Sequence, residues 1–368
     1  MMIATAYAIA FSLLTVYIFI MLKYIRLWNS TPDFSFSNSN SDVSISVIIP
    51  FYNEEKTIDR LIQSLLRQSL KKESWNVLFV NDNSTDRSIE IISRLCEGRL
   101  NFRLLNNNGS GKKRALTTGI NSVREGLIVT ADADCSFNPD WLKTISSFYH
   151  KNSADMIIMP VVMTGGDNFF QQFQKADFLA LQMVGAGAAL SGNPILCNGA
   201  NLTFKKQKEQ VTMNEKYASG EDIFMLEWMK RKGREIRYLK SKNVVAKTPG
   251  PETVRQFINQ RARWISKAGG YSDRSVVLMS LLFFGVNVFQ LILLIIGFTN
   301  HAYLALWLAF FTLKTITDYS LISSGFSFFE TKTSTVRFIL MQIIYPIYML
   351  FVSFYGIVFP VKWKRNKI

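Results

Sequence analysis

The chain is poor in the side chains that build zinc sites and disulfide frameworks. Its 368 residues include only three cysteines and two histidines. The cysteines have no paired spacing, so both kinds of framework are disfavoured and reduced thiols are expected. Charged residues are also missing from three long apolar runs, at 1–22, 275–313 and 338–361. A membrane region combined with a separate polar part is therefore expected.

The apolar runs predict membrane-spanning helices. A bilayer core of roughly 30 Å needs about 20 apolar helical residues. The first and last runs each suit one span, and the middle run is long enough for two, separated by a polar turn at Thr299–His301. The third of the four expected spans then runs from about 302 to 322, where Lys314 and Asp318 are spaced to pair on one helical face.

The first run is either an uncleaved anchor or a cleavable signal. A signal begins with basic residues, whereas here Lys23 and Arg26 follow the run. Cations at that end favour an anchor with a cytosolic exit, so the polar part is expected on the cytosolic side of an inner or plasma membrane. The basic segment 362–367 then falls outside, against the positive-inside tendency, unless the middle run is re-entrant or interfacial.

Basic residues outnumber acidic ones by 42 to 27, which gives a formal net charge of +15. Beside several spans, such residues are expected to attract anionic lipid headgroups. Nucleic-acid binding is the alternative explanation, but no nucleic-acid module is recognisable. Membrane lipids, and not nucleic acids, are therefore the expected partners.

Between the apolar runs, the hydrophobic pattern alternates between strand and helix. After a Ser/Asn-rich linker over 29–42, apolar segments at 43–50, 75–80 and 127–131 predict buried strands, each followed by a segment with helical spacing. This alternation predicts an α/β domain with a mainly parallel sheet and helices on both faces. Ligands of such sheets lie beyond the carboxyl ends of the strands.

Polar or acidic side chains follow each of the three predicted strands. The segments are Pro50–Glu55, Asn81–Asp86 and Asp132–Asp134. Each one alone has a structural explanation, as a helix N-cap or an Asx-turn. In the last segment, however, two carboxylates one residue apart repel each other unless a cation lies between them. Mg²⁺ or Mn²⁺ suits such oxygen ligands together with substrate phosphates, and an exposed acidic turn is the alternative.

The sequence over about 46–270 resembles family 2 glycosyltransferases, whose fold is the nucleotide-sugar-binding α/β domain called GT-A. SVIIPFYNEE is similar to the family's opening strand. By that resemblance the first donor-binding residues are Pro50, Tyr52, Asn53 and Glu54. FVNDNSTDRS is similar to the second strand and implies base or ribose contacts from Asp82. The family usually has two acidic residues here, so Asn81 departs from its pattern.

Two further motifs of the resemblance concern the donor and a metal. GSGKKRALTTGI is similar to the family's Gly-Lys-x-x-Ala-Leu helix opening, which implies donor binding by Lys112. Asp132-Ala133-Asp134 matches the DxD motif. That match implies direct binding of a divalent metal, Mg or Mn, by Asp134, and assigns Asp132 to both the metal and the donor sugar or ribose. The implied donor is linked to UDP or GDP.

The resemblance also implies a catalytic base and acceptor contacts. Ser219–Asp222 matches the family's Glu-Asp pair, which makes Asp222 the general base and places Glu221 at the acceptor. The Ser-x-x-Asp spacing also fits a helix-capping box, which is the structural alternative. Cys197–Asn201 resembles the family's acceptor-side segment and implies a sugar contact from Asn198 or Asn201.

Gln260-Arg261-Ala262-Arg263-Trp264 matches the Q-x-x-R-W motif of the family. On a helix over about 252–267, the three motif residues share one face. The resemblance implies donor binding by Gln260 and Arg263, the latter through a forked contact with the leaving pyrophosphate. Trp264 is expected to stack on the acceptor sugar. The alternative is an interfacial amphipathic helix whose Trp and Arg side chains anchor at headgroup level.

These segments define the expected domain order. It is a transmembrane anchor over 1–28, a linker over 29–42, a cytosolic GT-A catalytic domain over 43–250, an amphipathic interfacial helix over 251–274, a C-terminal membrane region of about three helices over 275–361 and a basic tail over 362–368.

The resemblance implies an inverting, metal-dependent glycosyltransferase. It moves a sugar from a nucleotide-sugar donor to a lipid-linked or growing polysaccharide acceptor at the membrane, and both processive synthesis and single transfer stay open. The competing classes are a non-catalytic membrane scaffold with a degenerate GT-A domain and a transporter. Four motif acids, Asp82, Asp132, Asp134 and Asp222, disfavour the scaffold, and the large polar domain disfavours a transporter.

Overall fold

The computed structural model describes residues 2–36, 43–207, 220–359, 362–363 and 366–367. The chain divides into two compact units. A sheet unit comprises Thr31–Thr164 and Pro194–Pro249, and a helical unit comprises Met1–Ser30, Gly165–Asn193 and Gly250–Ile368. The segment Gly165–Asn193 belongs to the helical unit, so it interrupts the continuous domain expected over 43–250.

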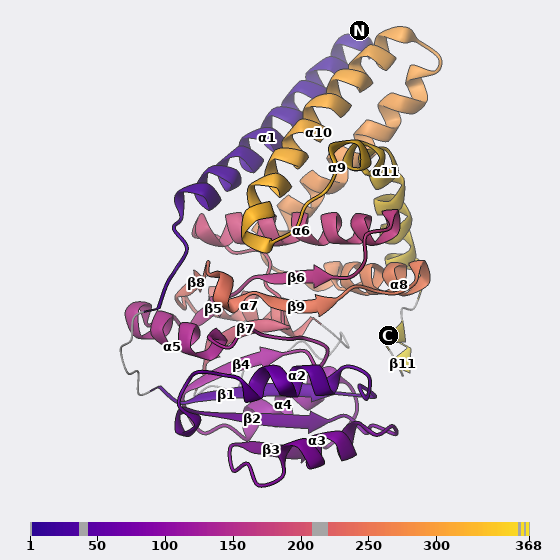
Figure 1. Ribbon diagram of the computed structural model, residues 1–368. Coiled ribbons are helices and arrows are strands. Elements are labelled where there is room, and N and C mark those ends of the chain that lie inside the picture. Colours follow the sequence, from indigo (N-terminus) through magenta and orange to yellow (C-terminus); the bar gives the residue numbers. More distant parts are fainter. Residues whose placement is uncertain (1, 37–42, 208–219, 360–361, 364–365, 368) are drawn as a thin grey trace. The chain divides into compact units, whose positions relative to one another are not determined.

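The sheet unit is built on a seven-stranded sheet with strand order β3-β2-β1-β4-β7-β5-β8 (Figure 1). Its strands are β1 (Ile45–Phe51), β2 (Trp75–Asn81), β3 (Phe102–Asn106), β4 (Leu127–Ala131), β5 (Met156–Ile158), β7 (Asn201–Lys205) and β8 (Ile236–Tyr238). β7 is antiparallel to β4 and β5, and the other neighbouring pairs are parallel. Two short strands, β6 (Val161–Thr164) and β9 (Ala246–Pro249), form a separate parallel pair. The predicted mainly parallel α/β sheet is confirmed.

The central strand β1 is buried along its whole length. Since alternate side chains of a strand point to opposite faces, this burial requires cover on both faces of the sheet. The helices of the unit are α2 (Ile58–Leu66), α3 (Ser88–Cys96), α4 (Lys112–Asn121), α5 (Trp141–Asn152) and α7 (Glu221–Arg231), with short 3-10 turns η1 (Lys72–Ser74) and η2 (Lys242–Val244). α4 packs against β1 and β2 and begins at Lys112.

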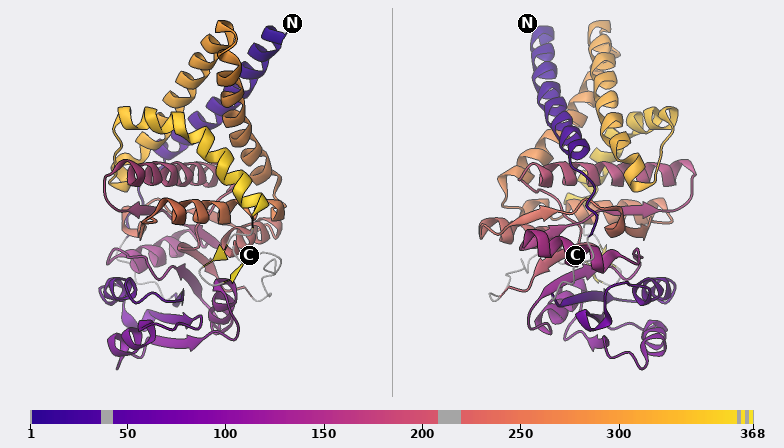
Figure 2. Two further views of the ribbon diagram at one scale, coloured as in Figure 1. Left: turned by 90° about the vertical axis from the view of Figure 1, so that its right-hand side faces the viewer. Right: turned by 60° about the vertical axis from the view of Figure 1, so that its left-hand side comes forward.

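The helical unit contains six long helices among its described residues. They are α1 (Met2–Ser30), α6 (Phe169–Leu190), α8 (Val254–Ile265), α9 (Arg274–Gly297), α10 (His301–Phe329) and α11 (Thr335–Val358), together with the turn η3 (Ala268–Gly270) and the short strands β10 (Lys362–Trp363) and β11 (Asn366–Lys367). α1 and α10 pack together and run in the same direction. The Tyr17 hydroxyl donates to Asp318 Oδ1, and further along Trp28 Nε1 donates to the carbonyl of Ser324. Figure 2 shows these helices from two further directions.

Three helices in the described part of the chain are long and apolar enough to cross a membrane: Ala4–Ser30, Arg274–Gly297 and Thr335–Val358. The third of the four expected spans corresponds to α10, which is helical but is not among these three. α10 carries Lys314, Asp318 and many Ser and Thr side chains, and these lower its mean hydropathy. The four-span arrangement therefore stays a prediction.

Two details of α10 agree with the sequence analysis. The expected turn before it is present: α9 ends at Gly297, and the Asn300 side chain caps α10 by accepting a hydrogen bond from the Ala302 N–H at 2.9 Å. The expected ion pair is present too, because Lys314 Nζ lies 2.8 Å from Asp318 Oδ2. Gln342 of α11 adds a second acceptor for the same ammonium, also at 2.8 Å.

Candidate functional site

The polar segments that follow β1 and β2 meet, as predicted, but they largely bind each other. Asn53 adopts a left-handed conformation, with φ of 52°. Its Oδ1 accepts a hydrogen bond from the Thr85 N–H at 2.8 Å, and its own N–H donates to Ser84 Oγ at 3.1 Å. The Glu54 N–H donates to Ser88 Oγ at 2.8 Å. These contacts clamp the two loops together, so donor contacts by Asn53 and Glu54 stay predictions.

Asp82 is buried, and its carboxylate holds the start of α4. Both of its oxygens accept from the Gly111 N–H, at 2.8 and 2.9 Å, and Asn107 Nδ2 donates to Oδ1 at 2.7 Å. Gly111 has a φ of 101°, which an L side chain rarely adopts, so glycine suits this N-cap. Asp82 therefore fixes the backbone that presents the next residue, Lys112. The Oδ1 of the neighbouring Asn81 accepts a hydrogen bond from the Ser84 N–H at 2.8 Å.

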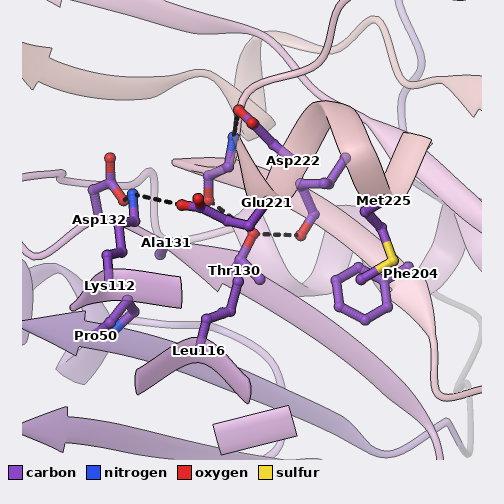
Figure 3. A pocket seen from close by; sticks show the side chains of 12 residues that line it. Pro50, Lys112, Leu116, Thr130, Ala131, Asp132, Phe204, Glu221, Asp222 and Met225 are labelled. Carbon is purple, nitrogen blue, oxygen red and sulfur yellow. Dashed lines mark hydrogen bonds and ion pairs between the residues drawn. The ribbon is translucent and has the colours of Figure 1, made fainter. Parts of the chain in front are cut away.

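Lys112 links two carboxylates from different elements (Figure 3). Its ammonium lies 2.5 Å from Asp132 Oδ1, beyond the end of β4, and 3.7 Å from Glu221 Oε1, at the start of α7. Burial favours the neutral amine, but the charges of Asp132, Glu221 and Asp222 outweigh it and raise the pKa of Lys112 above its ordinary value. The side chain is therefore a fixed cation at neutral pH.

Asp222 lies in the first turn of α7 and lines the same pocket as Lys112 and Asp132. Its Oδ2 accepts a hydrogen bond from the Gly199 N–H at 3.1 Å (Figure 3). The N-cap of α7 is Gly220, which makes no side-chain cap, and Ser219 lies outside the described residues. The alternative explanation, a capping box, requires Ser219 as the N-cap, whereas the N-cap in the structure is Gly220.

Five of the predicted site residues line this one pocket: Pro50, Lys112, Asp132, Glu221 and Asp222. Its remaining wall includes apolar side chains from α4, β7 and α7, namely Leu116, Leu202, Phe204 and Met225. The pocket therefore joins one fixed cation and three carboxylates to an apolar surface. Such a combination can orient a hydroxyl beside an apolar surface, and its excess of negative charge favours a cation.

Asp134 lies beside Thr248 of β9, whose Oγ1 is 3.4 Å from Asp134 Oδ1. The backbone carbonyl of Asp134 accepts a hydrogen bond from Arg60 Nη2. Among the residues that the structure describes, no three His, Cys, Asp or Glu side chains lie close enough together to hold a metal ion. Mg²⁺ commonly binds through one or two carboxylates and completes its shell with water and substrate phosphates. Metal binding by Asp132 and Asp134 together with a donor diphosphate stays a prediction, and in this structure Asp132 pairs with Lys112.

Cys135, which follows directly, does not add a ligand. Its side chain is fully buried, and burial together with the charges of Asp134 and Asp132 raises the pKa of the thiol. Metals bind the thiolate form of cysteine, so an oxygen-only ligand set is expected at this position.

The predicted acceptor contact from Asn201 is wrong. Asn201 is fully buried. Its Nδ2 donates to the carbonyls of Pro160 and Val244, at 2.8 and 2.7 Å, and its Oδ1 accepts from Trp141 Nε1 at 3.1 Å. Every donor and acceptor of the amide is thus used within the protein, and Asn201 ties β7 to α5 and to the segments before β6 and β9.

We expect Asn201→Ala to lower the free energy of unfolding by about 3 kcal/mol or more, because each buried polar group left unpaired costs about 1–3 kcal/mol. Thermal unfolding of the purified protein in detergent measures this loss. Asn152→Ala, which removes a single hydrogen bond to Phe148, is the matched control and should have a much smaller effect. A stable Asn201→Ala protein with a raised KM for the acceptor would restore the acceptor role.

Gln260, Arg263 and Trp264 lie on α8, in the helical unit. The helix that the sequence predicts here is confirmed, and it begins with a capping box formed by Thr253 and Gln256. The pocket belongs to the sheet unit, so contacts of these three side chains with the donor or the acceptor stay predictions. Tyr52 is half-buried at the end of β1, and its donor contact also stays a prediction.

Thr130 and Gly199 are pocket residues to which the sequence analysis assigned no role. Thr130 is the second-last residue of β4, and its Oγ1 donates a hydrogen bond to the Gly199 carbonyl at 2.8 Å. The Gly199 N–H in turn donates to Asp222. A threonine in an apolar strand is an ordinary β residue, so the sequence holds no signal for this role. Gly199 lies in the Cys197–Asn201 segment, in which the resemblance implies Asn198 or Asn201 as the contact residue.

A mostly parallel sheet gathers cationic and acidic side chains beyond the ends of its strands, where α/β domains of this kind bind their ligands. Residues 46–212 match the family model for glycosyl transferase family 2. The fold is shared with the mannosyltransferase PcManGT from Pyrobaculum calidifontis in complex with GDP-Man and Mn²⁺, with a TM-score of 0.61 and 15% identity over 99% of both chains. Over residues 46–212 this chain is thus similar to glycosyl transferase family 2 domains, and its fold is of the GT-A kind.

The curated relatives share the same region. The chain is 27% identical over 135 residues to poly(ribitol-phosphate) beta-N-acetylglucosaminyltransferase TarS of Staphylococcus aureus, covering 36% of this chain and 23% of that protein. It is 33% identical over 99 residues to the undecaprenyl-phosphate 4-deoxy-4-formamido-L-arabinose transferase of Photorhabdus laumondii, covering 26% and 30%. It is 30% identical over 142 residues to the uncharacterized glycosyltransferase YkcC of Bacillus subtilis, covering 38% of this chain and 43% of that protein. The chain thus spans less than half the length of each of these relatives.

Proposed function

We propose that this protein transfers a sugar, with inversion, from a nucleotide-sugar donor to a lipid-linked or polysaccharide acceptor at a membrane. The observation that carries the proposal is the convergence of Lys112, Asp132, Glu221 and Asp222 on one pocket within and beside the family 2 domain. The relatives support the substrate classes, since one is named for a poly(ribitol-phosphate) acceptor and another for undecaprenyl phosphate. Three apolar helices support membrane attachment, with the sheet unit on the cytosolic side.

The proposed chemistry assigns each charged group one task. Asp222, held in place by the Gly199 N–H, takes the proton from the acceptor hydroxyl as that oxygen attacks the anomeric carbon. The bond from that carbon to the diphosphate breaks, and the nucleoside diphosphate leaves. The fixed cation of Lys112 balances charge on the donor side, and Glu221 keeps the ammonium in place. Arg263 is proposed as a second cation for the diphosphate.

A divalent metal fits this scheme through Asp132 and Asp134. When bound there, Mg²⁺ or Mn²⁺ supplies Lewis-acid stabilisation of the diphosphate leaving group. We expect excess EDTA to reduce transfer to background and excess Mn²⁺ or Mg²⁺ to restore it, as measured by release of nucleoside diphosphate. Asp134→Asn should weaken the response to added metal. Full activity in EDTA would remove the metal from the proposal.

The function is tested with the full chain, purified in detergent and supplied with labelled UDP- and GDP-sugars. Polyprenyl phosphate and preformed polysaccharide serve as acceptors. A single lipid-soluble product supports one-step transfer, and a ladder of products supports a processive synthase. Donor binding without transfer to any acceptor, or neither binding nor transfer, would favour the non-catalytic scaffold and overturn the proposal.

A further inference from the structure

Arg261 occupies a position that the Q-x-x-R-W motif leaves unspecified, and it is nevertheless almost completely buried. Its Nε donates to Asp177 Oδ2 of α6 at 2.7 Å, and the side chains of both partners are 5% exposed. Removing two charges from water is costly unless their geometry is good and their other groups are satisfied. Nη2 of Arg261 has no hydrogen-bond partner among the described residues, and the other contacts of the guanidinium show which side chains the pair touches.

The guanidinium of Arg261 touches two of the three motif side chains directly. Nη1 donates to Gln260 Oε1 at 2.6 Å. The guanidinium carbon lies 4.2 Å from the ring centroid of Trp264 and 4.7 Å from that of Phe257. A planar cation can make a forked hydrogen-bond pattern and stack on aromatic rings at once, which a lysine ammonium cannot reproduce.

These contacts have chemical consequences for Gln260 and Trp264. Arginine has donors only, so the amide of Gln260 must present its oxygen to Arg261. Its Nε2, a donor, is then the atom left for an anionic ligand such as a phosphate. At Trp264 the cation covers one face of the indole, so a ligand can stack only on the opposite face.

The surroundings of the pair are closely packed aromatic rings. Phe257 stacks on Tyr348 of α11, with ring centroids 5.4 Å apart and an interplanar angle of 15°. Phe173 of α6 lies edge-on to both Phe257 and Tyr348. Arg261 thus sits among packed aromatic rings from three helices, and its guanidinium has little freedom to move.

We propose that Arg261 is a positioning residue, anchored by Asp177, that fixes the amide orientation of Gln260 and the ring of Trp264 for their ligands. The identity of those ligands, a nucleotide-sugar donor and a sugar acceptor, rests on the proposed function. The contacts that carry the proposal lie within the helical unit, and they do not depend on the proposed function.

The test compares Arg261→Lys with Arg255→Lys. Arg255 is an exposed arginine on the same helix, so its substitution is a matched control. Arg261→Lys keeps a cation beside Asp177 but loses the fork and the planar stacking. We expect a near-parental unfolding temperature and a kcat/KM lowered by up to about 100-fold, since misplacement of about 1 Å can cost that much. Arg255→Lys should leave both values unchanged.

A second readout does not require activity. In protein labelled with 5-fluorotryptophan, the ¹⁹F resonance of Trp264 is identified by its absence in Trp264→Phe. Arg261→Lys should shift that resonance, and Arg255→Lys should not. An unmoved resonance together with unchanged kinetics would overturn the proposal. If the parental protein transfers no sugar, the proposed function fails. The shift of the Trp264 resonance in Arg261→Lys then tests the positioning role of Arg261 by itself.

Should Arg261→Lys fail to fold, Asp177→Leu/Arg261→Met replaces both buried charges with apolar side chains and is expected to restore folding. Parental kcat/KM in that double variant would show that Gln260 and Trp264 need no positioning cation, and would overturn the proposal. A loss similar to that expected for Arg261→Lys supports it.

Discussion

Asp222→Asn is expected to lower kcat for sugar transfer by about 10²- to 10⁴-fold, the range typical for loss of a general base. The asparagine amide is nearly the same shape as the carboxylate, and its oxygen can still accept the Gly199 N–H that Asp222 binds at 3.1 Å. The amide cannot take up the proton of an acceptor hydroxyl. Because the loss concerns the chemical step, the KM for the donor should change little, and steady-state release of nucleoside diphosphate measures both constants.

Asp59→Asn is the matched control for this experiment. Asp59 is an exposed carboxylate in the first turn of α2, as Asp222 is in the first turn of α7. Both substitutions remove a negative charge from a helix N-terminus, which costs about 0.3–1 kcal/mol at an exposed site. Only the substitution in the pocket should affect turnover. Unchanged kcat in Asp222→Asn would contradict the base assignment and turn attention to Glu221.

Asp318→Leu is expected to lower the free energy of unfolding by about 3–5 kcal/mol, the usual cost of removing one partner from a buried ion pair. Lys314 is 2% exposed, and it would keep only the neutral Gln342 oxygen as an acceptor. Tyr17 of α1 would also lose its acceptor, since its hydroxyl donates to Asp318. The measurement is denaturant unfolding of the purified chain in mixed micelles, followed by loss of helical signal.

The double variant Lys314→Met/Asp318→Leu separates a charge effect from a packing effect. Replacing both members of a buried pair with apolar side chains of similar size is often neutral or stabilising, so the double variant should recover most of the loss. Thr312→Leu, an exposed polar-to-apolar change on the same helix, should stay within about 0.5 kcal/mol of the parent. Equal losses in the single and double variants would show that the loss does not come from the unpaired charge of Lys314.

The sequence predicts the strand ends well because each signal is local. A short apolar run that ends in polar residues can be recognised without knowing its neighbours, and in this fold such ends meet at one edge of the sheet. That reasoning placed Asp132 at this edge, and the family resemblance added Lys112 and Asp222. The structure shows that the three residues line one pocket. The i,i+4 spacing of Lys314 and Asp318 is equally local, and their pairing is also confirmed.

The roles of individual polar side chains could not be predicted in the same way. Asn201 stands in a motif-like segment, yet its three hydrogen-bond partners come from distant parts of the chain, at Trp141, Pro160 and Val244. Whether an amide faces a ligand or the core depends on those partners. The role of Asp82 also depends on a distant partner, since its carboxylate accepts a hydrogen bond from the Gly111 N–H.

By itself, then, the sequence determined the kind of domain, the membrane-type helices and the acidic and basic groups available for chemistry, because hydrophobic periodicity and short motifs act within a few residues. Only the tertiary structure decided which of those groups share a pocket, that Gly165–Asn193 leaves the sheet unit for the helical one, and that Arg261 is buried against Asp177. Burial and hydrogen-bond partnership depend on segments brought together from far apart in the chain, and no local pattern encodes them.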